Sequence, residues 1–289
     1  MPNNNWGGAN KKYKSNRPKF HLSIIFLLII VIFLLCFILY MITSQNNGIN
    51  SLTVLSSDTS VQDVSEEITA ETTTTTVATT TVSSPVNVNP VPENSPKDFS
   101  YFNDCVFIGD SLTVGLSSYG IIPEKNVLAN TGLNIDKIND AKIKTETGEI
   151  ALLDELKAVN PKNVYIMLGS NGIAWLSNEH MTEKYGEFID KIKAQHPDLT
   201  IYILSIPPVS VNKETSTEGS IQNTAIDSYN SELLKLADAK KINFVDINTA
   251  LKGNDGKLPV ESAGKDGMHF KKDTYTIMLN YILQHTVKE

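Results

Sequence analysis

The spacing of apolar and polar positions divides the chain into three stretches of different character. Residues 22–42 read LSIIFLLIIVIFLLCFILYMI and hold no charged side chain, whereas residues 43–97 are polar and show no helical or strand period. From residue 98 onward, short apolar runs alternate with amphipathic stretches. The pattern predicts a membrane-spanning helix, a disordered linker and a folded domain, in that order, after a polar head at 1–20.

The apolar stretch predicts an uncleaved membrane anchor at 21–42. As a helix, residues 22–42 are about 31 Å long, enough to cross a bilayer. A cleaved signal peptide has a shorter apolar core and a small-residue cleavage site, neither of which is found here. All five basic residues of the head precede the span, and no base follows it until Lys97. The positive-inside rule therefore places the head in the cytoplasm and everything after the span outside.

The linker at 43–97 is rich in Ser, Thr, Asn and Pro and contains the run ETTTTTVATTT at 71–81. Such a composition cannot bury enough apolar surface to offset the entropy lost on ordering. As a flexible coil it would span on the order of 40 Å, enough to hold a domain away from the lipid and within a cell wall. Whether the Thr run is glycosylated is left open by composition.

The region 98–289 carries the signature of a single three-layer α/β domain. Five short runs, apolar on both faces, are typical of parallel strands covered on both sides: Cys105–Ile108, Asn126–Ala129, Asn163–Leu168, Thr200–Leu204 and Asn243–Ile247. Helical stripes lie between or after them, including Met181, Tyr185, Phe188, Ile189 and Ile192; then Ile226, Tyr229, Leu233 and Leu236; then Tyr275, Met278, Tyr281 and Ile282. In such sheets the site lies beyond the carboxyl ends of the strands, so the loops after these runs are the ones to inspect.

Charge and composition exclude several function classes. The folded region is mildly acidic and the only basic cluster is the N-terminal head, so a nucleic-acid binder is excluded. The two cysteines, Cys36 and Cys105, are too few for a disulfide-stapled fold or a cysteine zinc site. No two histidines stand at metal-ligand spacing, so we expect no metal and no cofactor.

Three of the inspected loops carry residues with catalytic potential. Ser111, in Gly109-Asp110-Ser111-Leu112, follows the first strand at a helix start, where a nucleophile could stand with its N–H unpaired. Gly132 follows the second strand, and Asn171 follows the third with an amide that could donate to an oxyanion. Each is also an ordinary turn residue, so none is specific alone.

A fourth loop, before the last helix, contains Asp266-Gly267-Met268-His269. An Asp three residues before a His can accept from Nδ1–H and fix the tautomer, which leaves Nε2 to take a proton from Ser111. The competing interpretation is an Asp-Gly turn beside a surface histidine.

Taken together, the four loops resemble the SGNH, or GDSL, hydrolase family. Its four blocks are matched by Gly109-Asp110-Ser111-Leu112, Gly132, Gly169-Ser170-Asn171 and Asp266-Gly267-Met268-His269. The resemblance covers 98–289. It implies a flavodoxin-like sheet of order 2-1-3-4-5, Ser111 as nucleophile, His269 as base and Asp266 as its partner. It also implies an oxyanion hole formed by the Ser111 N–H, the Gly132 N–H and the Asn171 side chain.

One position departs from that pattern. The third block usually ends in Asp, but here the residue is Gly172, which removes a carboxylate that would normally brace the loop. A Gly-x-Asn-Gly block looks like the extracytoplasmic domains of peptidoglycan O-acetyltransferases. Those enzymes usually bring, or partner with, a multi-span membrane protein that exports the acetyl group, whereas this chain has one predicted span.

These observations predict an extracytoplasmic serine esterase that removes O-acetyl groups from cell-wall or other extracellular carbohydrate. Trp175 could stack on a sugar ring, or could equally be a packing aromatic. A polysaccharide O-acetyltransferase, acting with an acetyl-exporting partner, is the alternative, because the sequence does not say whether water or a sugar hydroxyl accepts the acyl group. A noncatalytic wall-binding domain is the second alternative.

Overall fold

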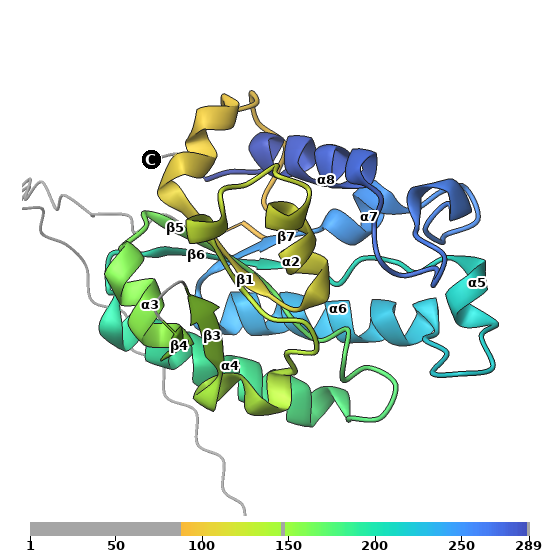
Figure 1. Ribbon diagram of the computed structural model, residues 1–289, viewed down its shortest axis with the longest axis horizontal. Helices are drawn as coiled ribbons and strands as arrows, with labels where there is room; N and C mark the ends of the chain where they lie inside the picture. The colour runs from red at the N-terminus through yellow and green to blue at the C-terminus, as the bar shows by residue number, and fades with distance from the viewer. Residues whose placement is uncertain (1–87, 146–147, 288–289) are drawn as a thin grey trace, which may run out of the picture. The chain divides into compact units, whose positions relative to one another are not determined.

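The computed structural model describes residues 88–145 and 148–287. The predicted head at 1–20, the predicted anchor at 21–42 and most of the predicted linker lie outside these residues. Within the described ranges no helix is both long enough and apolar enough to cross a membrane. The described part of the chain forms an α/β domain around one parallel sheet (Figure 1).

The sheet has five parallel strands in the order β2-β1-β5-β6-β7. Their bounds are β1 Cys105–Gly109, β2 Val127–Ala129, β5 Asn163–Met167, β6 Thr200–Leu204 and β7 Asn243–Val245. In the register, Phe107 of β1 lies opposite Val127 of β2 and Tyr165 of β5. The five predicted strands and their order are confirmed. The fifth ends two residues earlier than expected, because Asp246 caps a helix that begins at Ile247.

Helices cover both faces of the sheet. Those on one face are α2 Ser111–Ser118, α7 Ile247–Leu251 and α8 Lys272–Gln284, and those on the other are α3 Leu152–Val159, α4 Asn178–Gln195 and α6 Asn223–Lys240 (Figure 1). Shorter elements are η1 Phe99–Asp104, η2 Glu124–Asn126, η3 Ile135–Asp140, α5 Val211–Glu214 and η4 Val260–Ser262. This split follows from right-handed crossovers between parallel strands.

Aromatic side chains fill the layer between the strands and the helices of the first face. The Tyr165 ring stacks on Phe107 with centroids 5.3 Å apart and on Tyr202 with centroids 4.4 Å apart. The Tyr165 hydroxyl shares a 2.9 Å hydrogen bond with that of Tyr101, so its polar end is satisfied. Three central strands are thereby tied side by side, which gives their carboxyl ends a fixed spacing.

A small hairpin was not expected from the sequence. Strands β3 Lys142–Thr145 and β4 Gly148–Ala151 pair antiparallel beside the main sheet. Along β3 only Ile143 is buried, so the apolar signal amounts to a single side chain. A stretch this short and polar carries no period that a sequence pattern could reveal.

The folded region begins before its expected start at residue 98. Val91 is 2% exposed, and its N–H donates to the Phe244 carbonyl at the β7 edge. The N–H groups of Asn94 and Lys97 donate to the carbonyls of the last two residues of α8, Gln284 and Leu283. These bonds are irregular and come mostly from polar residues, so residues 88–97 resemble linker in composition although they pack on the domain.

Candidate active site

Ser111 lies at the first turn of α2, directly after β1. Asp110 caps the helix, since its carboxylate accepts the Leu112 N–H at 3.0 Å. The N–H of Ser111 belongs to the first helical turn, whose donors have no partner within the helix. A Cβ at Gly109 would stand 2.0 Å from Thr113 Oγ1 and 2.6 Å from the Met167 carbonyl, so only glycine allows this tight turn. The turn therefore presents a hydroxyl and a free amide at the sheet edge.

His269 and Asp266 meet Ser111 from the loop before α8. The Asp266 carboxylate accepts the backbone N–H groups of Met268 at 3.2 Å and His269 at 3.1 Å, and its other oxygen pairs with His269 Nδ1. His269 Nε2 lies 2.7 Å from Ser111 Oγ, across 158 positions of sequence. The structure thus joins three predicted site residues in one hydrogen-bonded relay.

The surroundings of Asp266 keep its carboxyl group ionised, as the partner of a histidine must be. Partial burial by itself raises the pKa of Asp266, but hydrogen bonds from the His269 ring and from the two backbone N–H groups outweigh it and lower that pKa. The carboxylate is therefore ionised at neutral pH and holds the proton of His269 Nδ1. That tautomer leaves Nε2 as the acceptor facing Ser111.

Gly132 lies on the loop after β2 and Asn171 on the loop after β5. Gly132 adopts φ +79°, a left-handed conformation that glycine favours, and a Cβ there would meet no atom within 4 Å. The Asn171 amide donates to the Leu133 carbonyl at 3.0 Å and to the Asp110 carboxylate at 3.5 Å. Asn171 is thus brought between the loops of Ser111 and Gly132, with its amide directed to protein acceptors.

Asp110 is a site residue to which the sequence analysis gave no role. Its side chain is fully buried, and burial raises its pKa to about 6. It caps α2, the helix of Ser111, and accepts from Asn171, so one carboxylate links two of the four loops. The sequence signal for the capping role of Asp110 was its position directly before the helix start at Ser111, where Asp is a preferred N-cap.

The loop after β5 is braced without the carboxylate that Gly172 lacks. The Asn171 carbonyl accepts both from the Asn134 amide at 3.0 Å and from the Trp175 indole N–H at 2.9 Å. A Cβ at Gly172 would lie 2.7 Å from Met181 Sδ, so glycine lets the loop pack tightly on α4. Trp175 is 66% exposed, so its ring faces solvent. Its indole N–H is nevertheless satisfied, because it donates to the Asn171 carbonyl.

A second histidine–carboxylate pair lies apart from the serine. His180 Nε2, on the first turn of α4, is 2.6 Å from an oxygen of Asp136 in η3. Across residues 88–145 and 148–287, no group of three His, Cys, Asp or Glu side chains could hold a metal ion.

Comparisons with known proteins agree with this architecture. The sequence profile of the GDSL-like Lipase/Acylhydrolase family matches residues 107–277, more than half of the chain. Among solved structures, a Streptococcus pneumonia protein described as a platelet activating factor is 21% identical, with a TM-score of 0.50 over 63% of this chain and 87% of that one. This likeness shows the fold.

Two further solved structures are similar at lower TM-scores. A GDSL-like lipase from Bacteroides thetaiotaomicron VPI-5482 is 20% identical, with a TM-score of 0.45 over 62% of this chain and 85% of that one. A carbohydrate esterase of family 3 from Talaromyces cellulolyticus is 15% identical, with a TM-score of 0.44 over 62% and 93%. No curated protein matches the chain.

Proposed function

The chain belongs to the GDSL-like lipase/acylhydrolase family and acts on ester bonds, and from that premise we propose that it is a Ser111-dependent esterase that deacetylates extracellular carbohydrate. One observation carries the catalytic part of this proposal: the 2.7 Å contact between His269 Nε2 and Ser111 Oγ, extended to Asp266 through Nδ1.

The proposed reaction proceeds through a covalent acyl-enzyme. Ser111 Oγ attacks the ester carbonyl carbon while its proton passes to His269 Nε2, and the carbonyl π electrons move onto the oxygen. Collapse of this tetrahedral species breaks the bond to the alcohol, which leaves with the proton from His269. Water then attacks the acyl-enzyme, giving one proton to His269. The second collapse releases the carboxylic acid and returns the proton to Ser111.

The developing oxyanion needs donors that are aimed at it in advance. The Ser111 N–H, in the first turn of α2, and the Gly132 N–H, on an open glycine turn, are proposed for this role. The Asn171 amide is the third. Its 3.5 Å bond to Asp110 is the weaker of its two bonds, so that N–H is the easier one to redirect to an oxyanion.

The location that we propose favours an extracellular polymer as the substrate. We propose that residues 21–42 anchor the chain, with 1–20 cytoplasmic and the linker holding the domain outside the membrane. Trp175 supports a carbohydrate substrate, because its exposed ring lies on the loop of Asn171 and its indole N–H is already satisfied. An acetylated wall polymer or exopolysaccharide is both extracellular and made of sugar rings, so it fits both observations.

A polysaccharide O-acetyltransferase is the second candidate. Gly172 favours it, because a Gly-x-Asn-Gly block resembles the domains of peptidoglycan O-acetyltransferases. The two reactions share the acyl-enzyme and differ only in whether water or a sugar hydroxyl attacks it. Hydrolysis needs no further protein, whereas transfer of exported acetyl groups would need a multi-span partner. We therefore propose hydrolysis.

The test combines labelling with product analysis. Intact cells that express the full chain are treated with a fluorophosphonate probe that does not cross membranes, and we expect labelling of wild type but not of Ser111→Ala. The purified full chain is then given an activated acetyl ester with and without chitooligosaccharide. Free acetate as the main product supports hydrolysis, and faster accumulation of acetylated sugar would show a transferase. Equal activity of wild type and Ser111→Ala would refute the serine mechanism.

A further inference from the structure

Two of the proposed oxyanion donors come from different loops, so the spacing of these loops matters for the reaction. The Gly132 N–H lies on the loop after β2, and the Asn171 amide lies on the loop after β5. All donors of an oxyanion hole must stand about 2.7–3.1 Å from the one position that the oxygen will occupy. A displacement of one loop against the other therefore removes a donor, even when each loop keeps its own conformation.

Asn134 and Asn171 join the two loops through a reciprocal pair of hydrogen bonds. The Asn134 side-chain amide donates to the Asn171 carbonyl at 3.0 Å, across 37 positions of sequence. In return, the Asn171 side-chain amide donates at 3.0 Å to the carbonyl of Leu133, the residue before Asn134. Each loop thus gives the other one side-chain donor and one backbone acceptor, and Gly132 directly precedes Leu133.

The Asn134 side chain is itself held in one orientation. Its Oδ1 accepts the Asp136 N–H at 3.0 Å and thereby caps η3. An amide group has its oxygen on one side and its NH₂ on the other, so fixing the oxygen also fixes the direction of the donor. The NH₂ group of Asn134 is therefore aimed at the Asn171 carbonyl before any substrate arrives.

The Trp175 indole does not replace Asn134 in this arrangement. Its N–H donates to the same Asn171 carbonyl at 2.9 Å, but Trp175 lies only four positions later in the chain, on the same loop. That bond stabilises the turn of one loop. It does not set the distance between Asn171 and Gly132.

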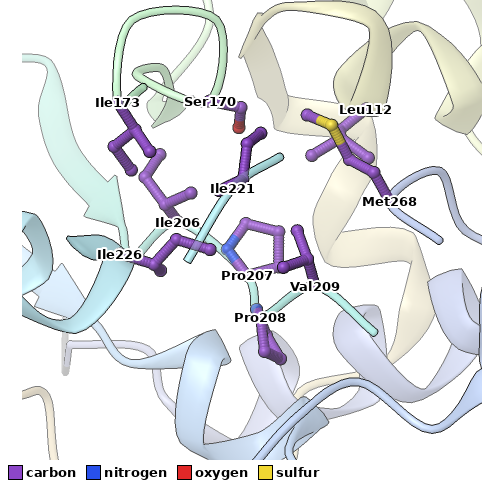
Figure 2. Close-up of a pocket in the computed structure, with 10 residues that line it drawn as sticks. All are labelled: Leu112, Ser170, Ile173, Ile206, Pro207, Pro208, Val209, Ile221, Ile226 and Met268. Atoms are coloured by element: carbon purple, nitrogen blue, oxygen red, sulfur yellow. The ribbon is translucent and has the colours of Figure 1, made fainter. Parts of the chain in front are cut away.

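Packing on the inner side of the loop leaves room for a shift. Ser170 and Ile173, before and after Asn171 in the chain, line a cavity of about 10 Å³ whose other walls include the loop after β6 (Figure 2). Side chains beside a void lack contacts on that side, so they resist a displacement less than closely packed ones do. The bonds to the neighbouring loop are therefore needed to hold Asn171 in place.

We propose that Asn134 is a positioning residue, which sets Asn171 against Gly132 so that both donors are aimed at one oxyanion. The inference rests on the proposed serine esterase function and adds a residue that acts through Asn171. Asn134 also supplies, from the neighbouring loop, a brace that the third block lacks at Gly172. Loss of this brace leaves the nucleophile and its base in place, so catalysis slows but does not disappear.

Asn134→Ser separates this role from the capping of η3. Serine is as good an N-cap as asparagine, but it lacks the NH₂ group that bonds Asn171. A misplacement of about 1 Å can cost about 100-fold in rate; because the bond to Leu133 persists, we expect a smaller shift and a loss of about 10-fold in kcat. KM should change little, because the oxyanion donors act in the transition state.

Asn139→Ser is the matched control, because it removes the same atoms. Asn139 lies in η3, the element that Asn134 caps, and is half-buried as Asn134 is. Its amide donates to Glu187 of α4 at 3.1 Å and not to a loop of the site. The kcat of Asn139→Ser should therefore remain that of wild type.

The experiment measures kcat and KM of the full chain for p-nitrophenyl acetate, with thermal unfolding as a check on folding. It compares wild type, the two serine variants, Asn171→Ala and the double variant Asn134→Ser/Asn171→Ala. Asn171→Ala alone should lose on the order of 10²–10³ in kcat. If Asn134 acts through Asn171, its replacement matters little once that amide is gone, so the double variant should differ from Asn171→Ala by less than about 2-fold.

Three outcomes would overturn the inference: wild-type kcat in a folded Asn134→Ser, losses that multiply in the double variant, or an equal loss in Asn139→Ser. In each of these cases the esterase proposal stands, because wild type is active. If wild type shows no Ser111-dependent hydrolysis, the proposed function itself is wrong, and the positioning role of Asn134 is wrong with it.

Discussion

Replacement of Asp266 by Asn tests the relay most sharply, because the two residues have the same shape. In the structure, one Asp266 oxygen accepts the N–H groups of Met268 and His269, and the other pairs with His269 Nδ1. An Asn must keep its carbonyl oxygen on the two backbone donors, so its NH₂ group then faces Nδ1. Nδ1 is forced to become an acceptor, which moves the ring proton to Nε2.

That tautomer cannot accept the proton of Ser111, because Nε2, at 2.7 Å from Oγ, already carries one. In a serine protease the corresponding Asp to Asn change lowers kcat about 10⁴-fold with its geometry intact. A loss of this size corresponds to about 5 kcal/mol of activation free energy. We expect a similar loss here, with little change in KM.

The assay is hydrolysis of p-nitrophenyl acetate by the full chain, with thermal unfolding as a check on folding. Asp136→Asn is the matched control, since it alters the other His–Asp pair, at His180, and should leave kcat close to that of wild type. A loss of less than about 10-fold in a folded Asp266→Asn would refute the tautomer argument.

Two further predictions concern stability. The pKa of Asp110 is raised to about 6 by burial, so the folded state binds a proton at this carboxyl more tightly than the unfolded state. Wild type should therefore lose stability relative to Asp110→Asn as pH rises from about 4 to 6. In urea unfolding at pH 4 to 7, the variant should gain on wild type by on the order of 3 kcal/mol, and a pH-independent difference would contradict this. Gly172→Asp, which restores the usual residue of the family, should lower the free energy of unfolding by about 1–3 kcal/mol, because its Cβ would stand 2.7 Å from Met181 Sδ. Thermal unfolding measures the loss, which should be smaller when Gly172→Asp is made in a Met181→Ala background than in wild type. An equally stable Gly172→Asp would show that the loop can yield.

The sheet was predictable because its strands are buried on both faces. All five residues of β1 and of β5 are buried, so each strand appears in the sequence as a short continuous apolar run between polar turns. The β3–β4 hairpin lacks such a run. Residues 88–97 were assigned to the linker because their contacts are hydrogen bonds by polar residues, which leave no period in the sequence.

The site residues could be predicted from the order of the four loops along the chain. The contacts that hold these residues in place could not. Ser111, Asn171, Asp266 and His269 each follow a strand or precede the last helix, and topology brings strand ends together. The bracing of Asn171 by Asn134 and Trp175 depends on how two loops meet, which no spacing in the sequence encodes. The burial of Asp110 likewise depends on the layers packed around it.

The route by which the chain enters the domain has a mechanical consequence. Any pull on the chain before residue 88 reaches first the hydrogen bonds of Asn89, Val91, Asn94 and Lys97. These bonds attach to β7 and to the end of α8, whereas the hydroxyl–imidazole pair is held by β1, α2 and the loop before α8. A tensile load applied to the chain before residue 88 would therefore be borne at the β7 edge of the sheet, away from Ser111 and His269.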